Sequence, residues 1–240
     1  DYDKLLIATG SSPIQPPIPG IDLDCVQSCW TLQDARNIIN LARPGSNVVL
    51  IGAGFIGCII LEALVKRGVN LNVVETGNRM VPRMLDDKAG GLLKRWCENK
   101  GVTVNTSCLV QAINETGSGA TVQLDNGNTL PADLVITATG VKSNLELVQG
   151  TGIATDQGIL VDEYLQTNLP NVYAAGDVAQ GYDFSTGQQT VQAIQPTATD
   201  HGRIAALNMC GKITRHHGSV NMNVLDTLGL ISCSFGSWMG

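Results

Sequence analysis

The sequence predicts an α/β protein in which helices flank a parallel sheet. Three observations support this fold class: a glycine loop between an apolar run and a helix-like segment, a strand pattern that occurs twice, and an unusual composition. The chain has 27 glycines in 240 residues and only 4% aromatic residues, which suits many tight strand–helix turns better than a β-sandwich or a coiled coil. Its 43% hydrophobic content is enough for a buried core.

Charge and cysteine content narrow the class of protein. The net charge is −6, which argues against a nucleic-acid partner because such binding needs clustered Lys and Arg. No apolar run is long enough to cross a bilayer and no signal-peptide pattern is present, so we predict a cytoplasmic protein without a membrane partner. Cys25 and Cys29 form a C-x-x-x-C pair that matches neither zinc nor thioredoxin spacing. Its role is left open, and no metal site is predicted.

The first elements precede the glycine loop. Residues Asp3–Gly10, "DKLLIATG", have the pattern of a strand. The segment Ser11–Gly20 is rich in proline, so we expect an extended or turning connection without regular structure. A helix is predicted from its capping residue Thr31 to Ala42, with Asp34 at the third helical position in place of the usual Glu.

A complete βαβ unit follows. Asn47–Ile51 is predicted to be a buried parallel strand, and Gly52–Gly57 the turn after it. A helix then runs from Phe55 until Gly68 closes it, and Asn70–Glu75 forms the next strand.

Four more elements are predicted further along. They are a helix over Asp86–Gly101, a strand over Val102–Thr106, a hairpin over Gly119–Leu130 and a strand over Asp133–Gly140. In the hairpin, the Asn126-Gly127 dipeptide between alternating apolar residues predicts a type I′ turn.

The strand pattern at the start of the chain is repeated. Asp3–Gly10 and Asp133–Gly140 share an Asp, a hydrophobic strand and the ending Ala-Thr-Gly. In the second copy the strand closes a unit that opened at Gly52, a normal span for one doubly wound nucleotide domain. The repeat therefore predicts two similar domains, with the first glycine loop lying upstream of the sequence.

The glycine loop has the features of a dinucleotide-binding fingerprint. Gly52 permits the strand-to-helix turn, Gly54 lets the backbone approach a pyrophosphate, and Gly57 lets helix and strand pack closely. Glu75 stands at the end of the next strand, about twenty positions on, where a carboxylate accepts from a ribose diol and repels a 2′-phosphate. A purely structural glycine turn does not account for Glu75. We therefore favour NAD(H) over NADP(H), although Arg79 offers a competing charge for such a phosphate.

Several motifs together resemble one known family. "LLIATGSSP", "VVLIGAGFIG" with "VVE", "MVPRMLDDKAGGLL", "LPADLVITATGVKSN" and "TNLPNVYAAGDVA" occur in the order found in the FAD-dependent pyridine nucleotide-disulfide oxidoreductase family. The resemblance is to the branch with NADH oxidases, rubredoxin reductases and the flavoprotein part of nitrite reductases. It extends from Tyr2 to about Met209.

The resemblance implies a Rossmann-like NAD domain inserted in a partial FAD domain, as in flavoproteins with two dinucleotide-binding domains. On this map residues 1–28 end the first FAD-domain segment and 29–143 form the NAD(P)-binding domain. Residues 144–210 return to the FAD domain, and 211–240 begin a C-terminal interface domain.

The resemblance also implies cofactor contacts. It places Asp177 and Gly176 beside the flavin nucleotide, and the start of a helix at Pro196 near the flavin ring. The NAD-side residues would be Gly52, Gly54, Phe55, Ile56, Gly57, Glu75, Thr139 and Gly140, and the FAD-side residues Thr9, Gly10, Gly176, Asp177, Pro196 and Thr197.

The chain departs from the family pattern in three places. Ile59 stands where many relatives carry a Glu, Gln195 precedes the flavin-side proline, and the opening FAD loop is absent. The three histidines, His201, His216 and His217, have no partner motif, so no catalytic side chain is assigned.

The implied function is an NAD(P)H-dependent flavoprotein oxidoreductase that moves a hydride from NADH to FAD and electrons to an unidentified acceptor. The candidate partners are nucleotides, an electron-acceptor protein and a second copy of the chain. The alternative is that the chain as given is an NAD-binding module without bound flavin or turnover, because an FAD without its main pyrophosphate loop should bind weakly.

Overall fold

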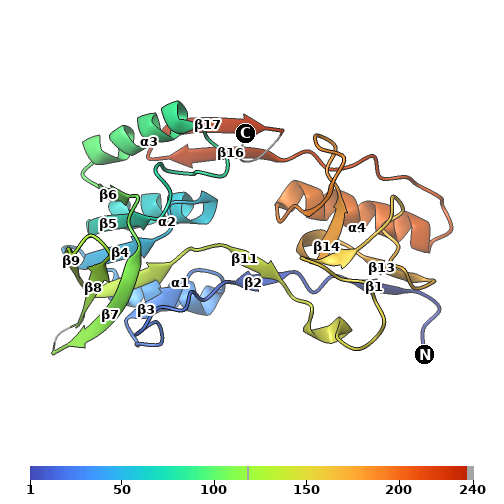
Figure 1. The fold of residues 1–240 in the computed structure, drawn as a ribbon, viewed down its shortest axis with the longest axis horizontal. Coiled ribbons are helices and arrows are strands. Elements are labelled where there is room, and N and C mark those ends of the chain that lie inside the picture. The colour runs from blue at the N-terminus through green and yellow to red at the C-terminus, as the bar shows by residue number, and fades with distance from the viewer. Residues whose placement is uncertain (118, 237–240) are drawn as a thin grey trace. The chain divides into compact units, whose positions relative to one another are not determined.

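The computed structural model describes residues 1–117 and 119–236 of the chain (Figure 1). The last four positions of the predicted segment 211–240 therefore lie outside the described residues. The chain divides into two compact units. The first contains Asp1–Ser12, Val141–Met222 and the described end from Phe235, and the second contains Pro13–Gly140 and Asn223–Ser234.

The second unit is built on a five-stranded parallel sheet. β4 lies in its middle, with Val49 paired to Asn72 on one side and to Val135 on the other. Alternate residues of β4 face opposite layers and nearly all are fully buried, as expected for a central parallel strand. The strands in spatial order are β3 (Val26–Ser28), β10 (Leu134–Thr137), β4 (Asn47–Ile51), β5 (Asn70–Glu75) and β6 (Thr103–Thr106).

Three helices cover one face of this sheet. Leu61 and Leu64 of α2 pack with Leu50 in the larger core cluster of the unit. The helix α1 begins after Thr31, and Thr31 and Asp34 form the reciprocal bonds of a capping box, which confirms the predicted helix start. The helices are α1 (Leu32–Leu41), α2 (Phe55–Lys66) and α3 (Asp87–Asn99).

An antiparallel sheet covers the opposite face. Its apolar residues, including Val122 and Leu124, pack against Val49 and Val135 of the parallel sheet. This second layer explains why β4 is buried on both sides. Its strands are β7 (Val110–Thr116), β8 (Gly119–Leu124) and β9 (Thr129–Ala132).

The turn between β8 and β9 corrects one prediction. Gly127 has a φ of +86°, but Asn126 does not have a positive φ, whereas a type I′ turn needs both. Gly127 N–H donates to the Leu124 carbonyl at 3.1 Å, so the loop is a three-residue turn that ends in a left-handed glycine. The Asn126 side chain accepts from Asn128 N–H at 3.0 Å, as in an Asx turn.

Several strands were not predicted, among them β2 (Ser11–Pro13), β3, β7 and the strands after β10. β2 lies in the proline-rich segment that we expected to be irregular, and it pairs with β11 (Val141–Ser143). Pro13 is tolerated because it stands at the end of the strand. β3 and β7 were missed since each is held by pairing with distant strands and shows little alternation of its own.

A hairpin from the end of the chain packs onto the second unit. β16 (Met222–Thr227) pairs with β17 (Leu230–Phe235), and Leu225 is buried in the helix-side core. Trp96 of α3 donates its indole N–H to the Thr227 carbonyl at 3.1 Å. The hairpin is therefore part of the core of this unit.

The first unit is assembled from separate parts of the sequence. β1 (Leu5–Ile7) pairs in parallel with β13 (Val172–Ala174), so residues far apart in the chain form one small sheet. Helix α4 (Gln195–Met209) packs on the core around β13. The remaining elements are η1 (Glu146–Val148), β12 (Ile159–Leu160), η2 (Gly176–Val178), β14 (Ala179–Tyr182) and β15 (Gln189–Val191). Among the described residues, no helix is both long and apolar enough to cross a membrane.

Candidate cofactor sites

The glycine turn lies at the carboxyl edge of the parallel sheet. It follows β4, and the strand order reverses there, because β5 and β6 extend to one side of β4 and β10 to the other. Open α/β sheets bind their ligands at such a switch point. Gly52 N–H donates to the Val74 carbonyl at 2.8 Å, which fixes the turn to the neighbouring strand.

The three loop glycines have different surroundings. Gly52 has a φ of +101°, and a Cβ there would lie 2.4 Å from the Ala138 carbonyl oxygen. A Cβ on Gly57 would lie 2.2 Å from the Gly52 carbonyl oxygen. Gly54 differs, since its φ is −76° and a Cβ added there would meet no heavy atom within 4 Å. Gly52 and Gly57 are therefore required by the protein's own packing, whereas Gly54 leaves open space beside the backbone.

The start of α2 offers unpaired donors beside this space. The first intrahelical bond runs from Cys58 N–H to the Gly54 carbonyl at 3.0 Å, and no side chain caps the helix. The N–H groups of Phe55, Ile56 and Gly57 therefore come before the helix's own hydrogen bonding. The side chains of Phe55 and Ile56 pack against the core, so only their backbone is suited to an anion.

Glu75 is fastened to the glycine turn. Its Oε2 accepts from Ala53 N–H at 2.8 Å, and its Oε1 accepts from Gly77 N–H at 2.7 Å and from the Thr76 hydroxyl at 3.2 Å. The sequence reasoning missed this bracing role, which gives Glu75 a function inside the protein. A carboxylate has about four acceptor positions, so one remains for a ribose hydroxyl.

The Arg79 side chain binds groups that lie close to it in the sequence. Its guanidinium donates to the Leu85 and Pro82 carbonyls at 2.7 and 3.0 Å and pairs with Asp87 at 2.9 Å. It also donates to the side chain of Asn78 at 2.8 Å. Four of its five N–H donors are used in this way, which leaves little capacity for a 2′-phosphate.

The loop after β5 is hydrogen-bonded to the glycine turn. Val81 N–H donates to the Ala53 carbonyl at 2.8 Å, and Met80 is fully buried beside it. Val81 has a φ of +50°, a strained conformation for a β-branched residue. No sequence signal identifies this contact, because Val81 lies in an irregular segment and is not a turn-forming residue type.

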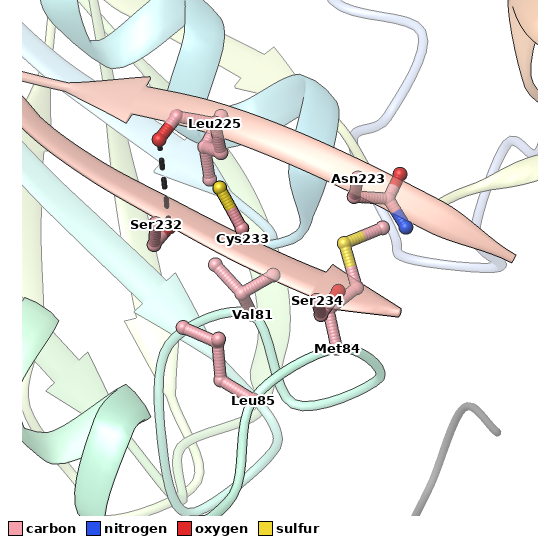
Figure 2. A pocket seen from close by; sticks show the side chains of 8 residues that line it. All are labelled: Val81, Met84, Leu85, Asn223, Leu225, Ser232, Cys233 and Ser234. Carbon is pink, nitrogen blue, oxygen red and sulfur yellow. Dashed lines mark hydrogen bonds between the residues drawn. The ribbon is translucent and has the colours of Figure 1, made fainter. Parts of the chain in front are cut away.

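A hollow near this loop is too small for a dinucleotide. Figure 2 shows side chains of the 81–85 loop and of both hairpin strands around it. Its volume is about 10 Å³, close to the space of a single water molecule and far below the range of cofactor pockets, and the glycine turn does not line it. The lining residues are Val81, Met84, Leu85, Asn223, Leu225, Ser232, Cys233 and Ser234.

The first unit brings its predicted site residues to one edge. β1 and β13 are parallel neighbours, so the turns after them, at Gly10 and at Gly176, meet at the same edge of the sheet. Ser11 donates its hydroxyl to Asp177 Oδ2 at 2.8 Å, and Ser143 donates to the Asp177 carbonyl at 2.7 Å. Asp177 is thus held by residues that no local pattern connects to it.

The start of α4 lies beside this edge. Gly176 has a φ of +77°, and a Cβ there would lie 3.5 Å from the Cβ of Ala198. Pro196 occupies the first turn of α4, and the first helical bond runs from Ala198 N–H to Ile194. Thr197 is buried, so its side chain faces the core and only its backbone N–H is suited to a ligand.

The two Ala-Thr-Gly turns occupy separate units. Thr9 donates its hydroxyl to the Asn144 carbonyl at 2.9 Å in the first unit. Thr139 donates its hydroxyl to the Ile14 carbonyl at 2.9 Å in the second. Both hydroxyl groups therefore contact protein backbone.

Two buried histidines contact each other, His201 in α4 and His216 in the segment after it. The rings of His201 and His216 stack edge to face with centroids 4.8 Å apart, and the Ser219 hydroxyl lies 3.4 and 3.2 Å from their Nε2 atoms. Burial, together with the neighbouring His216, lowers the pKa of His201 to about 4. Asp200 approaches the same nitrogen of His216 as Ser219 does, so this is not the geometry of a catalytic triad.

The cysteine pair has no shared environment. Cys25 packs against the core under the antiparallel sheet and Cys29 against the core on the helix side, and both are free thiols. Burial raises the pKa of each thiol, which disfavours the reactive thiolate. No group of three or more metal-ligating side chains occurs among residues 1–117 and 119–236.

Comparison with curated proteins finds relatives that match nearly the whole chain. Subunit epsilon of the NADH-dependent phenylglyoxylate dehydrogenase of Aromatoleum evansii is 37% identical over 98% of this chain and 56% of its own length. An NADH oxidase of Methanocaldococcus jannaschii is 34% identical over 93% of this chain and 50% of its own length. The chain therefore spans about half the length of these curated relatives.

Solved structures agree with this result. The water-forming NADH oxidase from Lactobacillus brevis, bound to NADH, has a TM-score of 0.92 at 27% identity over 98% of this chain and 52% of its own. The putidaredoxin reductase–putidaredoxin complex gives a TM-score of 0.92 at 26% identity, covering 99% of this chain and 58% of the matched one.

A family model described as pyridine nucleotide-disulphide oxidoreductase matches residues 1–202. Together with these relatives, this match shows that the chain belongs to the pyridine nucleotide-disulphide oxidoreductase family, whose members are NAD(P)H-dependent flavoproteins.

Proposed function

We propose that the protein containing this chain is an NADH-dependent flavoenzyme that passes electrons through FAD to an acceptor. The observation that carries this proposal is the open space beside Gly54, where the free N–H groups at the start of α2 meet the carboxyl edge of the sheet. A pyrophosphate fits such a place because backbone donors and the helix dipole both favour an anion. A Cβ added at Gly54 meets no side chain there.

The proposed NAD residues lie in the second unit. Gly54, Phe55, Ile56 and Gly57 would bind the pyrophosphate through their backbone, and Glu75 would accept from the adenosine ribose. Gly52 would shape the turn, and Thr139 and Gly140 would border the nicotinamide end.

The proposed FAD residues lie in the first unit. Asp177, fixed by Ser11, would accept from hydroxyl groups of the flavin nucleotide, and Gly10 and Gly176 would allow close approach of the backbone. The start of α4 at Pro196 and Thr197 would place its dipole toward negative charge on the flavin, and Thr9 would border the same site.

The chain's residues have positioning roles in this proposal. When bound, the nicotinamide and flavin supply the hydride and electron chemistry, as cofactors do in such enzymes. The protein binds and orients them and holds a fixed carboxylate at each edge. No described histidine or cysteine needs to move a proton, which agrees with the buried, low-pKa His201.

The preference for NADH rests on two side chains. Glu75 holds a carboxylate at the end of β5, where the adenosine ribose would lie, and the Arg79 guanidinium is bound by groups near it in sequence. A 2′-phosphate would therefore meet a negative charge that Arg79 is not free to offset.

The acceptor is proposed by class only. The phenylglyoxylate dehydrogenase subunit and the putidaredoxin reductase are named with protein partners, whereas the NADH oxidases are named for oxidation of NADH itself. We infer an electron-acceptor protein as the partner of this chain's parent protein.

A second candidate function follows from the first unit. In the described part of the first unit, no α-helix begins directly at a glycine turn as α2 does after Gly54. A flavin pyrophosphate without such a cradle would bind weakly, so the chain alone would be an NAD-binding module. The visible absorption spectrum of the purified chain separates the two readings. A stoichiometric flavin band supports the first, and a colourless chain that still binds NADH supports the second.

Gly54→Ala tests the proposed nucleotide site. The added Cβ meets no protein atom and the φ is ordinary, so the fold should be retained, whereas the methyl group would occupy the space of the pyrophosphate. NADH affinity measured by calorimetry should fall at least about ten-fold, since each lost backbone hydrogen bond to a charged group is worth about 1.5–3 kcal/mol.

Gly117→Ala is the matched control for this test. Gly117 lies in the same unit, lacks a positive φ and also leaves open space, with no atom within 4 Å of an added Cβ, but it stands between β7 and β8. Its NADH affinity should equal that of the wild type. Unchanged affinity in Gly54→Ala would remove the proposed pyrophosphate site.

A further inference from the structure

Two loops of the second unit each contain a residue other than glycine in the left-handed region. Val81, in the loop after β5, has a φ of +50°, and Ser107, directly after β6, has a φ of +54°. Such a conformation is uncommon for these residue types, and it persists only where the surrounding structure enforces it. Val81 donates its N–H to the Ala53 carbonyl of the glycine turn. The contacts of Ser107 show a related arrangement one strand further along the sheet.

Ser107 lies at the sheet edge that carries the proposed NAD site. β5 and β6 are parallel, and the last residues that pair between them are Glu75 and Thr106. Ser107 therefore follows at the carboxyl edge of the sheet, where open α/β sheets bind their ligands. All of these residues belong to the second unit. Ser107 is thus a neighbour of the carboxylate proposed for the ribose, although it is not part of the glycine fingerprint.

The backbone at Ser107 aims two consecutive N–H groups at the segment Glu75–Gly77. Ser107 N–H donates to the Gly77 carbonyl at 2.8 Å, and Cys108 N–H donates to the Glu75 carbonyl at 3.1 Å. An extended strand directs successive N–H groups to opposite sides, so it could not make both bonds to one neighbour. The left-handed φ of Ser107 is what brings the two donors to the same segment.

The residues on both sides of Ser107 are anchored. Thr106 is paired in the sheet, and its hydroxyl accepts from Lys94 Nζ at 3.0 Å. Cys108 is buried in the core under the antiparallel sheet, and the Asn126 side chain donates to its sulfur at 3.5 Å. Ser107 itself is exposed. Its conformation is therefore enforced by its neighbours, and its contribution to the site lies in its backbone.

We propose that Ser107 is a positioning residue whose left-handed backbone holds the segment Glu75–Gly77 at the nucleotide edge. The Glu75 side chain is bonded to Ala53 of the glycine turn, and the Glu75 carbonyl is bonded to Cys108. The carboxylate is therefore placed between the glycine turn and the residues that follow β6. This inference rests on the proposed function, because a displaced carboxylate costs affinity only if a nucleotide ribose uses it.

Three substitutions at residue 107 separate backbone conformation from side-chain contact. Ser107→Val places a β-branched residue at a positive φ, which is strongly disfavoured, so an extended backbone without the bond to Gly77 competes with the native one. Ser107→Gly adopts the left-handed φ without strain. Ser107→Ala removes the hydroxyl and keeps a similar conformational cost. Because the residue is exposed, none of the three changes the core.

Amide hydrogen exchange at Gly77, measured by NMR, tests the contact in the absence of nucleotide. Gly77 N–H donates to the Glu75 carboxylate, so its exchange reports how often the segment is released. Exchange at Gly77 should be at least about five-fold faster in Ser107→Val. Ser107→Gly and Ser107→Ala should exchange there at the wild-type rate. Exchange at Leu50 in β4 serves as the folding control.

Calorimetric affinities for NADH and NADPH test the positioning role. Ser107→Val should bind NADH about three-fold more weakly, because the binding-competent arrangement is populated only in part. The loss for NADPH should be smaller, since a displaced carboxylate also repels a 2′-phosphate less. A purely structural role would not move this ratio. Ser107→Gly should restore NADH affinity, and Ser107→Ala should equal the wild type.

Asn171→Val is the matched control for added strain. Asn171 is exposed, has a φ of +63° and belongs to the first unit. The same valine is therefore placed in the same backbone region outside the proposed NAD site. Both nucleotide affinities and the exchange at Gly77 should equal those of the wild type.

Each contrary result overturns the proposal. Unchanged exchange at Gly77 in Ser107→Val would show that the left-handed backbone does not hold the segment, and faster exchange with an unchanged affinity ratio would contradict the positioning role. An equal loss of NADH affinity in Ser107→Ala would assign the effect to the hydroxyl, and an equal loss in Ser107→Gly would exclude strain as its cause. A wild-type chain that binds no NADH removes the proposed function and this role with it, whereas wild-type binding without an effect of Ser107→Val removes this role alone.

Discussion

The two candidate cofactor edges use similar parts but distribute them differently along the sequence. In the second unit, the glycine turn and its carboxylate come from one βαβ segment, and the bond from Ala53 to Glu75 spans 22 positions. In the first unit, the bond from Ser11 to Asp177 spans 166 positions. Both edges place a glycine turn beside a fixed carboxylate, so similar chemistry can be reached by a local or a distant assembly.

The packing of the glycines also differs between the two edges. Gly57 is required because the Gly52 carbonyl oxygen fills the space of a Cβ, whereas Gly10 has open space and only a φ of +69°. The second unit therefore depends on close contact, and the first on backbone conformation. Substitution by alanine should separate these two dependences.

Gly57→Ala is expected to have the largest effect. A Cβ 2.2 Å from the Gly52 carbonyl oxygen forces α2 away from the turn, and such overpacking costs about 3 kcal/mol. Gly10→Ala in the first unit should cost only about 1–2 kcal/mol, since it adds a left-handed conformation without a clash. Urea unfolding midpoints measure both. Equal losses would contradict the difference in packing between the two edges.

The candidate cofactor edge of the second unit could be predicted from the sequence, whereas the contacts that form the edge of the first unit could not. Gly52, Gly57 and Glu75 follow a spacing that one βαβ segment dictates, so the strand, turn and helix were predicted near their observed bounds. Ser11 gave no signal, because its partner Asp177 is defined only by the pairing of β1 with β13. The resemblance to a family supplied Asp177, but not what holds it.

The misses have the same physical cause. β2 and β3 are three-residue strands that exist through their partners, so periodicity cannot identify them. The bracing of Glu75 and the strained Val81 depend on tertiary contacts of an irregular loop. The repeated Ala-Thr-Gly pattern was visible in the sequence, but the backbone carbonyls that accept from Thr9 and Thr139 were known only from the fold.

The first unit should be the more sensitive to acid. His201 has an ordinary pKa of about 6.5 when unfolded and about 4 when folded, because of burial first and the nearby His216 second, with Asp200 opposing. The unfolded chain therefore binds a proton that the folded chain excludes. The contribution of His201 to the free energy of unfolding is therefore complete above about pH 6.5 and is lost as the pH falls toward 4. The loss is about 2 kcal/mol between pH 7 and pH 5.

Urea unfolding at several pH values measures this loss. In His201→Gln the free energy of unfolding should change less between pH 7 and pH 5, even if the variant is less stable at every pH, because the titrating group is gone. His217→Gln is the control, since His217 is exposed and should leave the slope as in the wild type. A slope that is equal in all three proteins would show that the histidine cluster does not set the acid sensitivity.

Glu75→Ala should have the smallest effect, and it separates the two roles of this carboxylate. Loss of the bonds to Ala53 and Gly77 loosens the glycine turn and weakens NADH and NADPH alike, whereas loss of the ribose contact weakens NADH alone. The ratio of the two dissociation constants therefore isolates the ribose contact, and it should shift about five-fold toward NADPH. Thr76→Val removes only the hydroxyl bond to Glu75, so its ratio should not change. If Glu75→Ala weakens both nucleotides equally, Glu75 acts only by bracing the turn, and the two edges then share a structural carboxylate without a shared role in binding.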